Sequence, residues 1–312
     1  MHHVAERFAK AGLVLAHGTT DPVAEAAFIV AEVLHIPLER VETRAGAPVP
    51  STARQQVLAV AAQRVRTRKP AAYLLRRMYL RGVPFYVDER VIVPRSYLGE
   101  ILDGPLFAGG GALLAGGTGS VRSILDLCTG SGCLAILAAL RFPRAYVDAV
   151  DVSSEALDVA ARNVRDHRLA KRVRLLHGDL FAPLKSKRYD LIIANPPYVD
   201  AKGMAALPSE CRHEPRLALD GGRDGLAVVR RIVDEAGAHL TTEGGLLCEV
   251  GRGRRALTRA YPAKRFLWLD TEASEGEVFW LNAAELSQPF VPAKAGTQRK
   301  KLDSRLRGNE RS

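Results

Sequence analysis

Hydrophobic and polar positions change their pattern partway along the chain. Between residues 5 and 78, apolar positions recur at helical spacing, and Asp21-Pro22 supplies a capping residue and a proline for one helix start. A second helix is expected over residues 52–65. From residue 123 onward, short apolar runs alternate with helical runs. This alternation is typical of a mostly parallel sheet covered by helices on both faces, so we predict an α/β fold.

The α/β part contains most of the expected elements. Strands are expected at residues 124–127, 145–150, 173–176, 191–194, 245–249 and 266–269. Helices are expected at residues 133–140, 155–167 and 225–239. A last run at 278–282 follows a turn-rich stretch, so we expect it to pair antiparallel with the run before it. Between the helical and α/β parts, β-prone runs at 78–80, 85–87 and 91–93 predict a small hairpin.

Length and composition support a chain of two domains. The 312 residues exceed the roughly 150 of one typical domain. A content of 47% apolar and 25% charged residues is the profile of a globular protein. We divide the chain into a small helical N-terminal domain (1–77), a hairpin linker (78–96), an α/β domain (97–290) and a tail (291–312). The tail is basic and lacks apolar periodicity, which predicts disorder.

Cysteine usage and hydropathy narrow the class of protein further. The four cysteines form no CxxC pair and no histidine lies at ligand spacing, so we expect no disulfide framework and no metal site. No apolar run approaches the roughly 20 residues of a membrane span. The N-terminus lacks the apolar stretch of a secretory signal. We expect a reduced protein of the cytoplasm.

The net charge of +11 is unevenly distributed. The tail holds seven Lys or Arg against two acidic residues, and residues 54–82 hold eight basic residues and no acidic one. Such a stretch can contact the phosphates of nucleic acid, or it can be a solvated helix face. The sequence leaves both interpretations open. In the first, the contacts to RNA would come from Arg64, Arg66, Arg68 and Lys69.

A glycine turn is the first candidate for chemistry. An apolar strand runs into residues 126–132, DLCTGSG, before a helix begins. Glycines let the backbone approach a ligand closely, and a helix N-terminus offers free N–H groups. Asp151 ends the next strand, where a carboxylate can accept from both hydroxyls of a ribose. The predicted contacts to a nucleoside-containing cofactor are Asp126, Cys128, Thr129, Gly130, Ser131, Gly132 and Asp151. The same residues match a dinucleotide fingerprint, so a nicotinamide cofactor is an alternative.

The second candidate is the segment Asn195-Pro196-Pro197-Tyr198, which follows a buried strand. Each proline has a fixed φ and no N–H, so the segment presents carbonyls from a stiff backbone. Such a site suits a planar –NH2 group. The Asn195 side-chain oxygen and the Pro196 carbonyl can accept its two hydrogens, and Tyr198 can lie over the plane. This segment favours transfer of a group to an amide or amine nitrogen.

Together, these residues resemble the class I S-adenosylmethionine-dependent methyltransferases, and among them the protein-(glutamine-N(5)) methyltransferases, over roughly residues 20–285. The resemblance implies a Rossmann-like catalytic domain, a helical substrate-binding domain and S-adenosyl-L-methionine as cofactor. The family's cofactor turn corresponds to residues 128–132, its ribose carboxylate to Asp151 and its catalytic segment to residues 195–198. Its adenine contacts correspond to Asp179, which would accept from the amine, and Leu180, which would pack on the ring. Asn195 is expected to contact the cofactor as well as the substrate.

One branch of this family modifies peptide chain release factors, and another modifies large-subunit ribosomal protein three. The chain resembles the second branch in residues 87–96 (VDERVIVPRS), 127–133 (LCTGSGC) and 207–215 (LPSECRHEP). Ribosomal protein three is therefore the expected substrate, with ribosomal RNA of an assembly particle as a possible further partner. Arg95 and Glu214 lie in segments that the family shares. They could line the active site or pair structurally near it, and we favour the structural pair.

Three other functions are compatible with parts of the pattern. An adenine amino-methyltransferase of DNA or RNA would use Asn195–Tyr198 on a flipped base. An RNA-binding ribosome-assembly factor could use the fold without catalysis, although the intact Asn195 and glycine turn argue against it. A nicotinamide enzyme would leave the Asn-Pro-Pro-Tyr segment without a role.

Overall fold

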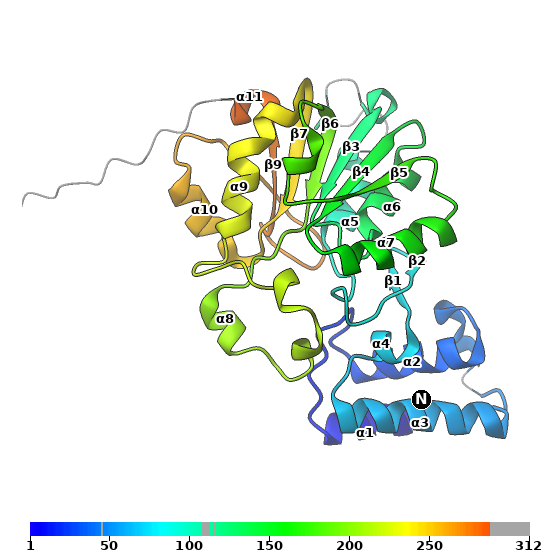
Figure 1. The fold of residues 1–312 in the computed structure, drawn as a ribbon. Helices are drawn as coiled ribbons and strands as arrows, with labels where there is room; N and C mark the ends of the chain where they lie inside the picture. Colours follow the sequence, from blue (N-terminus) through cyan, green and yellow to red (C-terminus); the bar gives the residue numbers. More distant parts are fainter. Residues whose placement is uncertain (45, 108–112, 115–116, 288–312) are drawn as a thin grey trace, which may run out of the picture.

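The computed structural model describes residues 1–44, 46–107, 113–114 and 117–287 of the chain. The tail for which the sequence predicts disorder, residues 291–312, lies outside the described residues. Figure 1 shows a group of helices below a larger α/β part, with a short hairpin between them.

The lower part is a small group of packed helices. They are α1 (His2–Lys10), α2 (Pro22–Leu34), α3 (Ser51–Thr67) and α4 (Ala71–Leu75). The Asp21 side chain accepts from the Val23 amide and caps α2, as the Asp21-Pro22 pair predicts. The apolar stripes of these helices meet in one core, which includes Phe8, Ile29 and Ala61. Both helices that the sequence predicts here are confirmed.

The hairpin consists of β1 (Met78–Leu80) and β2 (Val83–Phe85), which pair antiparallel. The expected strand at residues 91–93 is wrong, because this segment pairs with no other strand. The Val91 amide donates to the Asp88 carbonyl in a turn, and other backbone groups of the segment bond to side chains. The Val93 amide donates to Glu214, and the Val91 carbonyl accepts from the Tyr73 hydroxyl. Val91 and Val93 are buried all the same, so burial produced the apolar pattern that resembled a strand.

The α/β part is built on one sheet of seven strands in the order β5-β4-β3-β6-β7-β9-β8. The strands are β3 (Ser123–Leu127), β4 (Tyr146–Asp151), β5 (Val173–His177), β6 (Tyr189–Ala194), β7 (Leu240–Glu249), β8 (Leu267–Leu269) and β9 (Val278–Asn282). β3 to β7 run parallel, and β9 is antiparallel to both β7 and β8. The predicted α/β class and the antiparallel final pair are confirmed.

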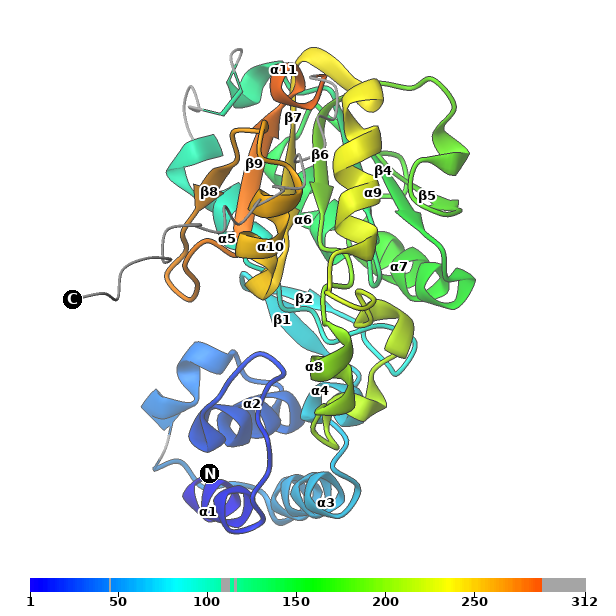
Figure 2. The same cartoon turned by 90° about the vertical axis from the view of Figure 1, so that its left-hand side faces the viewer.

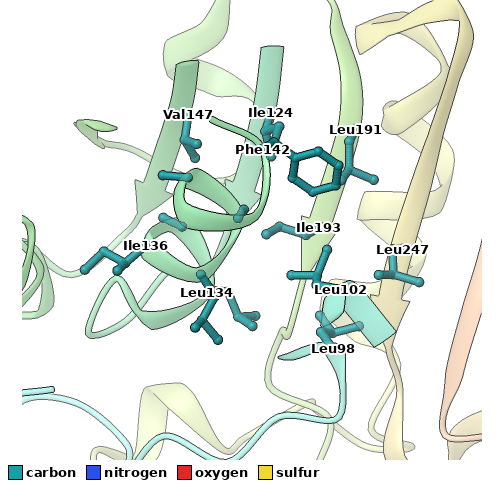
Figure 3. Close-up of a cluster of buried hydrophobic side chains, with 14 of the residues drawn as sticks. Leu98, Leu102, Ile124, Leu134, Ile136, Phe142, Val147, Leu191, Ile193 and Leu247 are labelled. Carbon is teal, nitrogen blue, oxygen red and sulfur yellow. The ribbon is translucent and has the colours of Figure 1, made fainter. Parts of the chain in front are cut away.

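Helices cover both faces of the sheet, because successive strand residues point to opposite sides. On one face, Ile124, Val147 and Ile193 pack against α5 (Leu98–Asp103) and α6 (Cys133–Arg141) (Figure 3). On the other face, the sheet packs against α9 (Ala227–Glu235), α10 (Arg254–Ala260) and α11 (Ala283–Leu286). The remaining helices are α7 (Ser154–Asp166) and the short α8 (Ala201–Ala205). Each fully buried aliphatic side chain in these cores contributes about 1.5–3 kcal/mol.

The strand order places a topological switch beside β3. The chain moves from β3 outward through β4 to β5 and then returns to β6 on the other side of β3. In open α/β sheets, the carboxyl ends of the strands at such a switch form a crevice that binds ligands. In Figure 2, this edge of the sheet faces the hairpin and the helical part.

Candidate active site

A cavity of about 290 Å³ lies at the carboxyl ends of β3, β4, β5 and β6. It brings together segments that are far apart in sequence. Its walls include six parts of the chain: the segment after the hairpin (90–92), the glycine turn (128, 130), the end of β4 (150–153), the turn after β5 (178–180), the end of β6 and the loop that follows (195, 197, 215, 217, 218), and α9 (231). Of the described residues that line it, none is a histidine or a lysine.

The glycine turn forms one wall of the cavity. Cys128 and Gly130 line it, both with positive φ, +58° and +55°. A Cβ atom added to Gly130 would meet nothing within 4 Å, so the backbone is open to a ligand there. Burial raises the pKa of the Cys128 thiol, and the Asp151 carboxylate adds to the shift. Cys128 is therefore a neutral thiol at neutral pH, not a nucleophile.

Other predicted cofactor residues of the turn lie behind this wall. Asp126 is fully buried, and its Oδ2 accepts from the Thr129 hydroxyl at 2.5 Å and from the Ala135 amide at 3.0 Å. Thr129 and Ser131 are buried as well. None of these three, nor Gly132, is among the residues that line the cavity. Their place indicates that they shape the turn and the start of α6.

Asp151 lies where a ribose carboxylate is expected. Its Oδ2 accepts from the Gly130 amide at 2.8 Å and its Oδ1 from the Ser153 amide at 2.9 Å. These bonds fix the carboxylate at the cavity wall, and each oxygen keeps a lone pair for a further donor. Burial raises the pKa of Asp151, although the amide bonds act in the opposite direction. The open backbone at Gly130 beside this carboxylate fits a nucleoside with two ribose hydroxyls.

Asp179 and Leu180 also line the cavity, as the resemblance implies. The Asp179 carboxylate is held by the Arg231 guanidinium of α9 through two bonds of 3.1 and 2.9 Å. Leu180 is buried, with a positive φ of +47°. Arg231 was not predicted as part of the site. Its partner Asp179 lies 52 positions earlier in the chain, and nothing in the sequence around Arg231 indicates that contact.

The Asn-Pro-Pro-Tyr segment closes the site at the end of β6. Asn195 and Pro197 line the cavity, whereas Pro196 is buried behind them. The Tyr198 hydroxyl donates to Glu249 Oε1 at 2.7 Å, and Tyr198 is not among the lining residues. The sequence reasoning missed Glu249. Its one signal there is an acidic residue at the end of the expected strand 245–249, directly after Leu246, Leu247 and Cys248.

Arg95 and Glu214 pair as expected, and the pair holds two cavity walls together. The Arg95 guanidinium donates to both Glu214 oxygens, at 2.5 and 2.7 Å, and the Val93 amide donates to Oε1 at 2.9 Å. His17 Nε2 lies 3.4 Å from Oε2. Burial alone would raise the pKa of Glu214, but the neighbouring His17 and the Arg95 guanidinium lower it to about 2.

The same cluster brings the ligand atoms of His17, Cys211 and Glu214 within 4.8 Å of one another. Sequence spacing could not reveal this grouping, because the three residues come from distant segments. The Arg95 cation already occupies both carboxylate oxygens, so we interpret the cluster as a clasp between loops. Pro215 and Leu217 on one side and residues 90–92 on the other are the cavity walls that it joins.

Six of the eight basic residues in the stretch 54–82 have acidic partners, so most of the stretch is not a free phosphate-binding surface. Arg64 is fully buried and bonds to Glu25, so its predicted role in RNA contact is wrong. Five other cations of the stretch also have acidic partners, in the pairs Arg68–Glu210, Lys69–Glu89, Arg76–Asp88, Arg77–Glu32 and Arg81–Asp103. The partners come from elsewhere in the chain, which is why the stretch alone looked unbalanced. Across the described part of the chain, no ion pair or hydrogen bond engages the side chains of Arg54 and Arg66.

The fold and this site define a class I methyltransferase, as the sequence predicts. The chain matches a family model described as "Methyltransferase small domain" over residues 111–209. It is 61% identical over 288 residues to a ribosomal protein uL3 glutamine methyltransferase of Bradyrhizobium diazoefficiens, covering 92% of this chain and 90% of that protein. It is 46% identical over 303 residues to the one of Burkholderia pseudomallei, covering 95% of each. The chain belongs to the family of ribosomal protein uL3 glutamine methyltransferases.

A comparison with solved structures finds weaker similarity. A methyltransferase from Pyrococcus furiosus is 17% identical, with a TM-score of 0.47, and the match covers 74% of this chain and 97% of that one.

Among the described residues, no helix is long and apolar enough to cross a membrane.

Proposed function

We propose that this enzyme transfers a methyl group from S-adenosyl-L-methionine to the side-chain amide nitrogen of a glutamine in ribosomal protein uL3. The proposal rests on one combination. The chain is similar to uL3 glutamine methyltransferases over 90% and 95% of their length, and Asn195 lies at the wall of a cavity that fits a nucleoside cofactor. The cofactor supplies an electrophilic methyl group on a sulfonium. We infer a cytoplasmic enzyme from the ribosomal substrate.

The cofactor-binding residues are assigned by position. The backbone at Cys128 and Gly130 would lie against the cofactor, and Asp151 would accept from the ribose hydroxyls. The Asp179 carboxylate would accept from the adenine amine while it also accepts from Arg231. Leu180 would pack on the adenine ring. Asp126, Thr129, Ser131 and Gly132 would act by holding the turn.

An amide nitrogen is a poor nucleophile, because its lone pair is delocalised into the carbonyl. The described cavity walls carry no histidine or lysine that could act as a strong base. Rate enhancement must then come from positioning and from preorganised acceptors. Asn195 Oδ1 and the Pro196 carbonyl would hold both amide hydrogens, direct the nitrogen lone pair at the methyl group and stabilise the positive charge that develops on nitrogen. The proton would leave afterwards to water.

The test is transfer of a labelled methyl group to purified uL3, a release factor and DNA, assayed in parallel. We expect label on a glutamine of uL3 alone. Asn195→Ala should keep the affinity for S-adenosylhomocysteine and lower kcat by about 10²- to 10³-fold, the effect of losing one preorganised hydrogen bond. Label on DNA adenine, or unchanged turnover in the Asn195 variant, would contradict the proposal.

Contact with ribosomal RNA is a separate hypothesis. Of the four residues expected to make it, Arg66 is the one that is exposed and has no acidic partner among the described residues, and we add Arg54 of the same stretch, which shares both properties. Phosphate contacts make binding salt-dependent. Replacing both residues with Gln should slow methylation of an assembly particle and flatten its salt dependence, and leave methylation of isolated uL3 unchanged. An equal effect on both substrates would exclude an RNA contact through these residues.

A further inference from the structure

Tyr198 is fixed at both ends of its side chain. Its hydroxyl donates to Glu249 Oε1 at 2.7 Å. Its ring lies against Gly251, where an added Cβ atom would come within 2.7 Å of two ring carbons. Gly251 also has a positive φ of +52°, which any side chain would strain. The aromatic residue of the catalytic segment is therefore anchored on the end of β7.

Glu249 joins this anchor to a second segment. It is 1% exposed, and its Oε2 accepts from the Ser96 hydroxyl at 2.7 Å and from the Tyr97 amide at 3.1 Å. Among the described residues, no cation forms an ion pair with it. Burial raises the pKa of Glu249, while the bonds from Tyr198 and Ser96 lower it. A buried carboxylate without a cation is costly, and this one is compensated by donors from two segments that flank the site.

We propose that Glu249 is a positioning residue for methyl transfer, acting through Tyr198 to set the geometry of Asn195 and the Pro196 carbonyl. This inference rests on the proposed function of the Asn-Pro-Pro-Tyr segment. Two consecutive prolines leave the backbone between Asn195 and Tyr198 few free torsions. A shift at Tyr198 is therefore passed on to the acceptors at the other end of the segment. Misplacement of reacting groups by about 1 Å can cost about 10²-fold in rate.

The chain contains a matched control on the same strand. Tyr189 begins β6, is fully buried, and donates its hydroxyl to Asp148 Oδ2 at 2.7 Å. Tyr189→Phe removes a tyrosine–carboxylate hydrogen bond of the same length at the opposite end of β6 from the site. Both Tyr→Phe changes are conservative, so both variants can be compared as folded proteins.

The experiment measures kcat and KM with uL3, and hydrogen exchange in the protein with S-adenosylhomocysteine at the amides of Asn195, Tyr198 and Val199, which are the amides of segment 195–199. We expect Tyr198→Phe and Glu249→Ala each to lower kcat about 10- to 100-fold, with KM little changed and faster exchange of the segment. The double variant should be no slower than the worse single one, because the two residues act as one unit. Glu249→Gln should restore most of kcat, since its amide can donate to the Tyr198 oxygen while its carbonyl accepts from Ser96 and Tyr97. Tyr189→Phe should change neither kcat nor this exchange.

Two results would overturn the positioning role. One is multiplication of the two single effects in the double variant; the other is unchanged exchange of residues 195–199 in Glu249→Ala. A general loss of stability would lower kcat in Tyr189→Phe as well, and Glu249→Gln would not restore kcat. Absence of methyl transfer to uL3 by the unaltered enzyme would refute the proposed function alone, because the exchange measurement does not depend on activity.

Discussion

Truncating Arg64 to methionine should destabilise the helical part of the protein by about 3–5 kcal/mol, the cost of leaving one partner of a buried ion pair behind. Arg64 is completely buried in α3, and its Nε donates to Glu25 Oε1 of α2 at 3.0 Å. Its other nitrogens donate to the carbonyls of Arg68 at 2.9 Å and Val14 at 3.3 Å. Methionine keeps much of the volume but none of these donors, so the Glu25 carboxylate would stay buried without a cation.

The assay is urea unfolding followed by circular dichroism, with hydrogen exchange in α2 and α3 to locate the loss. Arg66→Gln, two residues away and exposed, is the control and should change stability by no more than about 0.5 kcal/mol. The double variant Glu25→Leu with Arg64→Met should be more stable than Arg64→Met alone, since it buries no unpaired charge. If Arg64→Met and Arg66→Gln gave the same small change, the buried ion pair would be the wrong interpretation and a solvated face would be favoured.

Three further predictions concern the cofactor site and the tail. Asp151→Ala should weaken S-adenosylmethionine and S-adenosylhomocysteine alike, because both carry the ribose, and NADH should not bind; normal affinity for either in calorimetry would contradict the assignment. Burial raises the pKa of Asp126 from 3.8 to about 7, so the native state retains a proton that the unfolded chain releases between about pH 4 and 7. The stability of the unaltered protein relative to Asp126→Asn should therefore fall as pH rises through that window, and a constant difference in urea unfolding at pH 5 and 8 would refute this. Deleting residues 291–312 should leave the melting temperature and kcat unchanged, because the segment has no apolar face to bury; a large drop in melting temperature would show that it packs on the body.

The fold followed from local patterns to a large extent. Strand and helix periodicities between residues 123 and 282 predicted the parallel sheet and its antiparallel end, because each element there has one buried face that shows in sequence. The position of β9 between β7 and β8 was not predictable. Strand order depends on which hydrogen-bonding edges meet in space, and the side-chain pattern is the same at either place.

The candidate site, like the fold, was predicted in part from the sequence. Cys128, Gly130, Asp151, Asp179 and Asn195 were predicted, and the structure brings all five to one cavity. Each lies at the end of a strand, and parallel strands bring their carboxyl ends to one edge of the sheet. Asp126 and Tyr198 show the limit of such reasoning, because their side chains turn away from the cavity to partners that spacing cannot identify.

The sequence by itself determined the α/β class and predicted the glycine turn and the Asn-Pro-Pro-Tyr segment as candidate site elements, because these depend on residues that are close neighbours in the chain. Only the tertiary structure decided which charges are free and which buried groups are satisfied. Arg64 meets Glu25 across 39 positions, Arg95 meets Glu214 across 119, and Tyr198 meets Glu249 across 51. The energy of a charge depends on what lies within a few ångströms of it, and for these residues that neighbourhood is created by folding.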